Sequence, residues 1–174
     1  MHPLVRELGQ QYLEHIDRLT TKITELEQHL HRLSKDDETA VRLQTMPGIG
    51  PITAAAIEAF APPMATFRRG RDFAAWLGLV PRQHSSGGKS TLLGMSKRGN
   101  AYLRTLLIHG ARSAILAAQR KTENTNLWLA NLLSRRHPNI AAVALANKNV
   151  RAVWAILAHG REFKANYVPA RMAA

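Results

Sequence analysis

The sequence predicts an all-α protein, in which a long N-terminal coiled-coil helix precedes a compact helical domain with a helix-hairpin-helix motif. Apolar residues recur every three or four positions along most of the chain, which is typical of amphipathic helices. Gly- and Pro-containing turns separate these segments, and no segment is a convincing strand. We therefore expect a coiled-coil helix over 1–36, a helical domain over 37–165 and a loose tail over 166–174.

The first predicted helix has an apolar position about once per turn, at Leu4, Leu8, Tyr12, Ile16, Leu19, Ile23, Leu26, Leu30 and Leu33. From Ile16 onward the steps alternate between three and four, which is the heptad pattern of a coiled coil. The same pattern also suits an amphipathic helix packed on its own domain. We expect a homo-oligomer formed through residues 4–33, and we expect a linker at 34–37, where the pattern breaks.

A short helix ending at Met46, a Pro47–Gly50 turn and a helix over Pro51–Phe60 form the second predicted unit. The order of a Pro-Gly-Ile-Gly turn and an Ala-rich helix resembles a helix-hairpin-helix. Gly48 and Gly50 allow close backbone approach, and the next helix offers free amides and its positive dipole end to a phosphate. The alternative is a plain corner between two helices.

Further helices are predicted near residues 73–79, 101–118, 127–133 and 139–159. Ser96-Lys97-Arg98-Gly99-Asn100 is expected to cap the second of these. The stretch 80–91 is rich in Gly, Ser and basic residues, so we expect a flexible loop with no regular structure.

Within that loop, Ser85-Ser86-Gly87-Gly88-Lys89 has three interpretations. It is a flexible linker, a nest of backbone amides that binds phosphate, or the site of a serine nucleophile that attacks a phosphodiester. In the third case the glycines give access, and Lys or Arg stabilises the developing charge. The spacing is not that of a Walker A loop.

The charge of the chain is strongly positive and uneven. The net charge is +12; residues 1–40 carry five Lys/Arg against eight Asp/Glu (−3), and residues 41–174 carry nineteen against four (+15). Such a field attracts polyanions, so we expect DNA as a partner and no membrane. A ribosomal or nucleoid protein that binds through charge alone is the alternative. The expected nucleic-acid contacts are Gly48, Gly50, Arg82, Lys89, Lys97, Arg98, Arg104 and Arg112.

The sequence offers little for metal or thiol chemistry. There is no cysteine, which excludes disulfides and fits a cytoplasmic, nucleoid-associated protein. The acids after residue 40 are scattered, at Glu58, Asp72, Glu123 and Glu162. We therefore expect no metal site and no cofactor in this chain.

Taken together, residues from about 41 to 165 resemble the C-terminal transposase domain of the IS110/IS116/IS902 family of insertion-sequence transposases. The matching stretches are 46–50, 75–81, 86–89, 96–100 with 104–107, and 146–148 with 153–154. The preceding helix resembles the coiled coil that joins the two catalytic parts of these proteins.

The resemblance implies a recombinase in which a serine of this domain attacks DNA and forms a covalent link. Ser86, directly before Gly87, matches that serine best, and Ser85 is the fallback. It also implies a structured guide RNA, and an acidic RNase-H-like domain that binds Mg²⁺ and is not in this sequence. We therefore expect this chain alone to be incomplete and inactive. Two other hypotheses remain: a non-catalytic helix-hairpin-helix module that binds nucleic acid, and an oligomerisation fragment.

Overall fold

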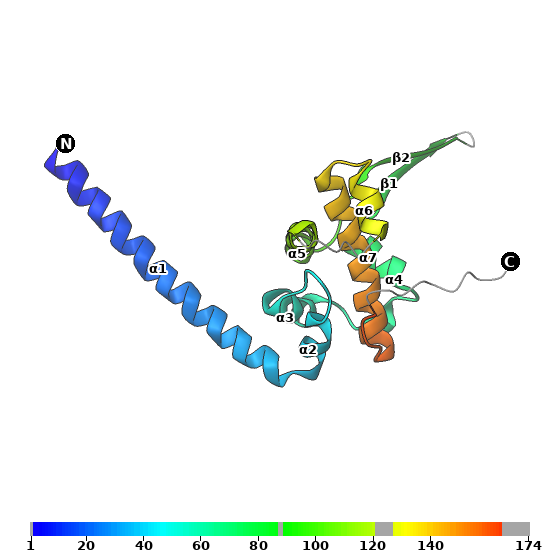
Figure 1. Cartoon of the computed structure of the whole chain (residues 1–174), viewed down its shortest axis with the longest axis horizontal. Helices are drawn as coiled ribbons and strands as arrows, with labels where there is room; N and C mark the ends of the chain where they lie inside the picture. Colours follow the sequence, from blue (N-terminus) through cyan, green and yellow to red (C-terminus); the bar gives the residue numbers. More distant parts are fainter. Residues whose placement is uncertain (1, 87–88, 121–126, 165–174) are drawn as a thin grey trace.

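The computed structural model describes residues 2–86, 89–120 and 127–164; for residues 85, 86, 89 and 90 it describes the backbone only. Helices dominate the described chain, as predicted, and a two-stranded sheet is added to them. Figure 1 shows a long helix that extends away from a packed group of shorter helices, and a hairpin that projects from another side of that group.

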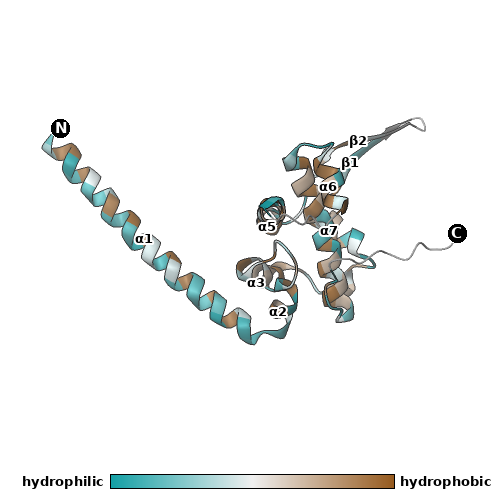
Figure 2. Ribbon diagram, in the orientation of Figure 1, coloured by the Kyte–Doolittle hydropathy of each residue, from teal (hydrophilic) through white to brown (hydrophobic). Residues whose placement is uncertain are grey.

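Helix α1 (Pro3–Asp36) is a single uninterrupted helix, about 50 Å long at 1.5 Å per residue. Pro3 occupies its first turn, where the missing N–H costs nothing. The apolar positions from Leu4 to Leu26 are exposed, and they appear as brown patches along an otherwise polar helix in Figure 2. The helix is therefore confirmed, whereas its predicted coiled-coil pairing stays a prediction.

The linker predicted at 34–37 is wrong. Helix α1 continues through Asp36, Ser34 is buried, and Asp37 alone separates α1 from α2 (Glu38–Gln44). The side chain of Asp37 caps α2, and α1 packs on both α2 and α3 (Pro51–Phe60). The polar residues that suggested a linker instead form a tight corner between two helices, because a capping carboxylate satisfies the free amides at the start of α2.

The remaining helices surround α7 (Pro138–His159), which packs on α4 (Gly70–Trp76), α5 (Ala101–Arg120) and α6 (Leu127–Leu133). A 3₁₀ turn, η1 (Met64–Thr66), precedes α4. The helix predicted at 73–79 begins earlier and ends at Trp76, whereas α5, α6 and α7 agree closely with expectation. The largest fully buried side chains are those of Phe73, Leu43, Met46, Ile57, Leu77, Leu103, Val150 and Val153.

Helix α7 is the one described helix that is long and apolar enough to cross a membrane by length and composition. Its apolar side chains are those of a core helix: Ala141, Ala146, Val150 and Val153 are among its buried residues. Because α7 packs between α4 and α5, its apolar composition is accounted for by its place in the core of the domain.

The prediction of a structureless loop over 80–91 is also wrong. Strands β1 (Pro81–Ser86) and β2 (Lys89–Met95) pair as an antiparallel hairpin. The register pairs His84 with Thr91 and Ser86 with Lys89, with an irregularity between Pro81 and Gln83. The ladder of backbone hydrogen bonds orders a sequence whose composition alone is typical of loops.

Candidate nucleic-acid interface

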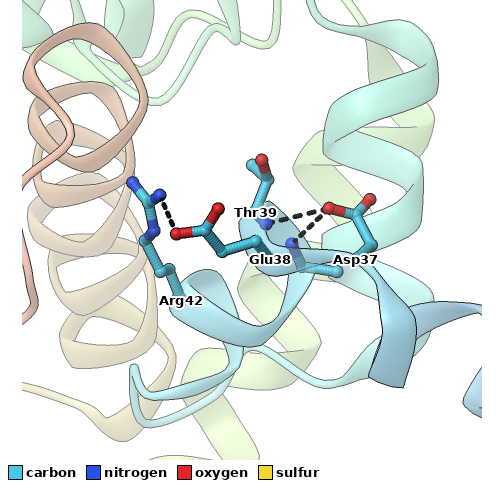
Figure 3. Close-up of polar contacts among 5 residues, drawn as sticks. Asp37, Glu38, Thr39 and Arg42 are labelled. Atoms are coloured by element: carbon cyan, nitrogen blue, oxygen red, sulfur yellow. Dashed lines mark hydrogen bonds and ion pairs between the residues drawn. The ribbon is translucent and has the colours of Figure 1, made fainter.

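Helix α2, which leads into the Pro47–Gly50 turn, is held at its start and along its length by side-chain contacts. Asp37 Oδ1 accepts hydrogen bonds from the amides of Thr39 (2.8 Å) and Ala40 (3.4 Å), and Glu38 pairs with Arg42 one turn later (Figure 3). Leu43 and Met46 are buried beneath the turn. The turn therefore starts from a capped and anchored helix.

Gly48 presses the turn against α5. It has φ +89°, a conformation that side chains disfavour, and a Cβ built on it would lie 2.5 Å from the carbonyl oxygen of Gly110. From α7, the buried amide of Asn149 donates a hydrogen bond to Pro47 O (3.0 Å). The predicted contact residue Gly48 thus packs inward, and its place in the structure is that of a spacer between two backbones.

Gly50, in contrast, lies in the open. It is the N-cap of α3, it is exposed, and nothing lies within 4 Å of a Cβ built on it. Pro51 follows at the first helical position, and the amide of Ala54 bonds back to Gly50 O (2.9 Å). The N-cap of α3 is therefore exposed, with the positive end of the helix dipole accessible there, whereas Thr53 and Ala54 of the first turn are buried.

The hairpin is joined to the helical body by two segments whose backbones interlock. The amide of Ser96 donates to Val80 O (2.9 Å), and that of Lys97 donates to Gly78 O (3.1 Å). Gly99 has φ +79°, and a Cβ on it would lie 1.7 Å from Trp76 O. Only glycine fits at this position, so the backbone before α5 packs directly on the end of α4 at the base of the hairpin.

Arg104 completes this interlock. Its Nη1 donates to Leu77 O (3.1 Å) and to Arg98 O (2.9 Å), so one guanidinium holds both segments at the base of the hairpin. Both Arg104 and Arg112 of α5 were expected to contact nucleic acid. Arg104 is half-buried and bonded to backbone carbonyls, whereas Arg112 is exposed.

The candidate serine lies at the outer end of the hairpin. Ser86 and Lys89 form the last described pair of the ladder, while Gly87 and Gly88 lie outside the described residues, as do the side chains of Ser85, Ser86 and Lys89. The backbone therefore brings Ser86 and Lys89 together across the hairpin, far from its base at Gly78 (Figure 1).

The other predicted basic contacts lie near that base. Arg82 is exposed on β1, and Lys97 and Arg98 are exposed in the turn before α5, where Lys97 has φ +57°. Asn100 caps α5 as predicted, because its Oδ1 accepts a hydrogen bond from Leu103 N (3.0 Å). Three exposed cations therefore surround the start of the hairpin, whereas Arg112 lies about three turns along α5.

Two asparagines of α7 that sequence reasoning assigned no role prove central to this arrangement. Asn149 reaches the Pro47–Gly50 turn, and Asn147 Nδ2 donates to Leu79 O (3.1 Å) at the hairpin base. The sequence did contain a signal for this role, namely two asparagines within an otherwise apolar helix, because a polar side chain that faces a core needs a hydrogen-bond partner.

Two acids meet at the corner. Partial desolvation and a hydrogen bond to Asp37 raise the pKa of Glu58 to about 7. The same hydrogen bond from Glu58, with the amides of Thr39 and Ala40, lowers the pKa of Asp37. The interaction between these two acids joins Glu58 of α3 to the carboxylate that caps α2.

Within the described ranges, no group of three or more His, Asp or Glu side chains comes together in a way that could hold a metal ion. Glu58 lies on α3, Asp72 on α4 and Glu162 beyond α7, and Glu123 falls outside the described residues. The described residues therefore do not fit a Mg²⁺ site.

Residues 40–125, which run from α2 through the hairpin and α5, match the model of the IS116/IS110/IS902 family of transposases. The chain belongs to this transposase family. The matched range contains the glycine turn, the interlocked hairpin base and Arg104. These features are therefore parts of a transposase domain.

Curated relatives extend the match over most of the chain. It is 49% identical over 157 residues to a "Probable family 20 transposase" of Pseudomonas aeruginosa, covering 90% of this chain and 45% of that protein. It is 45% identical over 159 residues to the transposase for insertion sequence element IS1111A of Coxiella burnetii, covering 91% and 43%. A transposase for element IS1328 of Yersinia enterocolitica is 43% identical over 150 residues, covering 86% and 45%. The chain thus spans a little under half the length of these relatives.

Proposed function

We propose that this chain is the DNA-binding, serine-bearing part of a guide-RNA-directed transposase, and that it acts with an acidic metal-binding domain outside this chain. The observation that carries the proposal is the hairpin, which holds Ser86 opposite Lys89 on a base locked by Gly99 and Arg104. A rigid base is what a reacting group needs, since small misplacements of a nucleophile cost large factors in rate.

In the proposed reaction, Ser86 Oγ attacks the phosphorus of a DNA phosphodiester. A bond forms between Oγ and phosphorus, the bond from phosphorus to one ester oxygen breaks, and that oxygen takes up the proton that the serine gives up. Lys89 and Arg98 are the proposed stabilisers of the charge that develops on the non-bridging oxygens. The covalent bond between serine and DNA conserves the free energy of the broken phosphodiester bond, which then allows the DNA end to be joined to a second strand.

Two features of the structure support DNA binding. The exposed N-cap of α3 at Gly50 suits a phosphate, and a contact there holds the nucleic-acid backbone without reading bases. Arg82, Lys97 and Arg98 are exposed at the hairpin base, and none of them forms an ion pair with a described residue. A DNA backbone that contacts the turn and the base would lead toward the hairpin end.

We also propose that α1 joins copies of the chain. Its apolar seam at Ile16, Leu19, Ile23 and Leu26 is about half exposed, which is costly for a lone helix in water. Ile at the first and Leu at the fourth position of successive heptads favour a two-stranded coiled coil. Pairing would bring two serine-bearing domains into one complex, as strand exchange between two DNA sites requires.

The test is a fusion of this chain to the part of the Pseudomonas relative that it does not cover, assayed with end-labelled DNA and RNA transcribed from that relative's insertion element. We expect a covalent protein–DNA adduct that Ser86→Ala abolishes and that Ser85→Ala, the matched control, leaves within about threefold. Strand exchange at the full rate by Ser86→Ala would refute the nucleophile. Salt-sensitive binding with no adduct on any substrate would instead indicate a non-catalytic binding module.

A further inference from the structure

A second basic surface lies on the face where the loop before α4 meets α7. Gly70 packs directly on α7: a Cβ built on it would lie 2.9 Å from Arg151 O and 3.3 Å from a ring carbon of Trp154. Because Arg69 and Arg71 are the chain neighbours of Gly70, this contact brings both of them beside Arg151. Residues that are 80 positions apart in sequence thereby share one surface.

The arginines of this surface are unneutralised. Arg68, Arg69, Arg71 and Arg151 are all exposed, and none forms an ion pair with a described residue. Asp72 is the one acid next to them in sequence, and its Oδ2 accepts the backbone amide of Arg69 (3.0 Å). Four arginines and one aspartate in these two segments give a local net charge of about +3 and a strong attraction for anions.

We propose that this arginine surface, formed by Arg68, Arg69, Arg71 and Arg151, binds the phosphodiester backbone of a nucleic acid. Guanidinium groups are planar, always charged and suited to bidentate contact with phosphate oxygens. The inference rests on the proposed function, in that it assumes a nucleic-acid ligand. It adds a contact surface outside the glycine turn and the hairpin.

The surface is placed to continue a path from the hairpin base. Asn147 of α7 holds Leu79 O at that base, and Arg151 follows one helical turn later, about 6 Å along the axis. Lys148, between them in sequence, is a further exposed cation, and its Nζ lies over the ring of Trp128 at 4.5 Å. A strand engaged at the hairpin base can therefore run along α7 to the arginine surface.

The experiment measures the salt dependence of binding by the full chain to a 30-base-pair DNA duplex and, separately, to an RNA hairpin of similar length. For Arg71→Gln/Arg151→Gln we expect weaker binding, and a slope of log K against log salt that is shallower by about 2, since each lost phosphate contact removes about 0.9. Arg71→Lys/Arg151→Lys should recover most of the slope. The matched control is Arg18→Gln/Arg32→Gln on α1, which removes the same charge far from this surface and should keep the wild-type slope.

Each outcome decides the proposal. A shallower slope on DNA or on RNA supports it and identifies which backbone the surface binds. If the salt-dependence slopes on DNA and on RNA are both unchanged, the arginine-surface proposal is overturned and the proposed function is not affected. The same conclusion follows if the α1 control Arg18→Gln/Arg32→Gln loses as much slope as Arg71→Gln/Arg151→Gln. Wild-type chain that binds neither nucleic acid overturns both proposals. Should circular dichroism show that the Gln pair is unfolded, Arg68→Gln/Arg69→Gln in the loop alone replaces it, with an expected slope change of the same size.

Discussion

Gly48 and Gly110 touch through their backbones: a Cβ on Gly48 would lie 2.5 Å from Gly110 O, and a Cβ on Gly110 would lie 1.8 Å from Gly48 O. The Pro47–Gly50 turn and α5 thus approach so closely that only glycine, which has no Cβ, fits at both positions. This contact sets where the exposed N-cap of α3 stands relative to the rest of the domain.

We predict that Gly48→Ala destabilises the domain by about 2–4 kcal/mol, because it adds a clash with backbone to an unfavourable φ of +89°. Gly50→Ala is the matched control in the same turn, where a Cβ meets nothing within 4 Å, and it should cost about 1 kcal/mol or less. Urea unfolding followed by circular dichroism measures both. Equal losses at the two positions would contradict the packing described for Gly48.

We predict that substitution of Arg104 lowers stability, whereas substitution of Arg112 weakens DNA binding. Arg104→Ala removes two hydrogen bonds to carbonyls and should cost about 2 kcal/mol, since Leu77 O and Arg98 O lose a charged donor. Arg112→Ala, on the exposed side of α5, should change stability by less than about 0.5 kcal/mol while weakening DNA binding at low salt. Urea unfolding and fluorescence anisotropy with labelled DNA distinguish the two. The assignment fails if Arg104→Ala unfolds like wild type.

Glu58 should make stability fall as pH rises. Its pKa is about 7 in the folded chain and 4.5 in the reference state, so unfolding releases a proton between these values and stability is lost from about pH 4.5 to pH 7. Because Glu58 is largely exposed, we expect a loss on the order of 1 kcal/mol. Glu58→Gln should be more stable than wild type at pH 8 by that amount, with a smaller difference at pH 5. Glu38→Gln is the control and should keep the wild-type pH dependence of the midpoint in urea.

Ile23→Lys should convert an oligomer to a monomer if the α1 seam joins copies of the chain. A charge at the centre of the seam opposes burial against a second helix, whereas the adjacent Thr24→Lys adds the same charge off the seam. Sedimentation velocity at micromolar concentration gives the mass of each. A wild-type chain that sediments as a monomer would refute the pairing.

The helices could be predicted because their signals are local. Pro51 after Gly50 marked the start of α3, and helical apolar spacing outlined α5 and α7. The Asp37 corner was mistaken for a linker, because capping and flexible segments use the same polar residues.

The hairpin and Arg104 could not be predicted, because what holds them is non-local. Strand β1 has the composition of a loop, and its order comes from cross-strand pairing and from a base built by residues of two segments. From the sequence, Arg104 was interpreted as one more exposed cation, because no neighbouring residue indicates that it bonds to the carbonyl of Leu77, 27 positions earlier.

The hairpin is supported at one end, so its length determines how far Ser86 stands from the helices. Deleting one residue from each strand would bring the tip about 3.4 Å closer to the helices and move each outer residue to the opposite side of the ribbon. Deleting two residues from each strand would bring the tip about 7 Å closer and return each outer residue to its original side. We therefore expect relatives with different target geometry to differ in the length of this hairpin by two residues per strand, because such steps keep each outer residue on the same side of the ribbon.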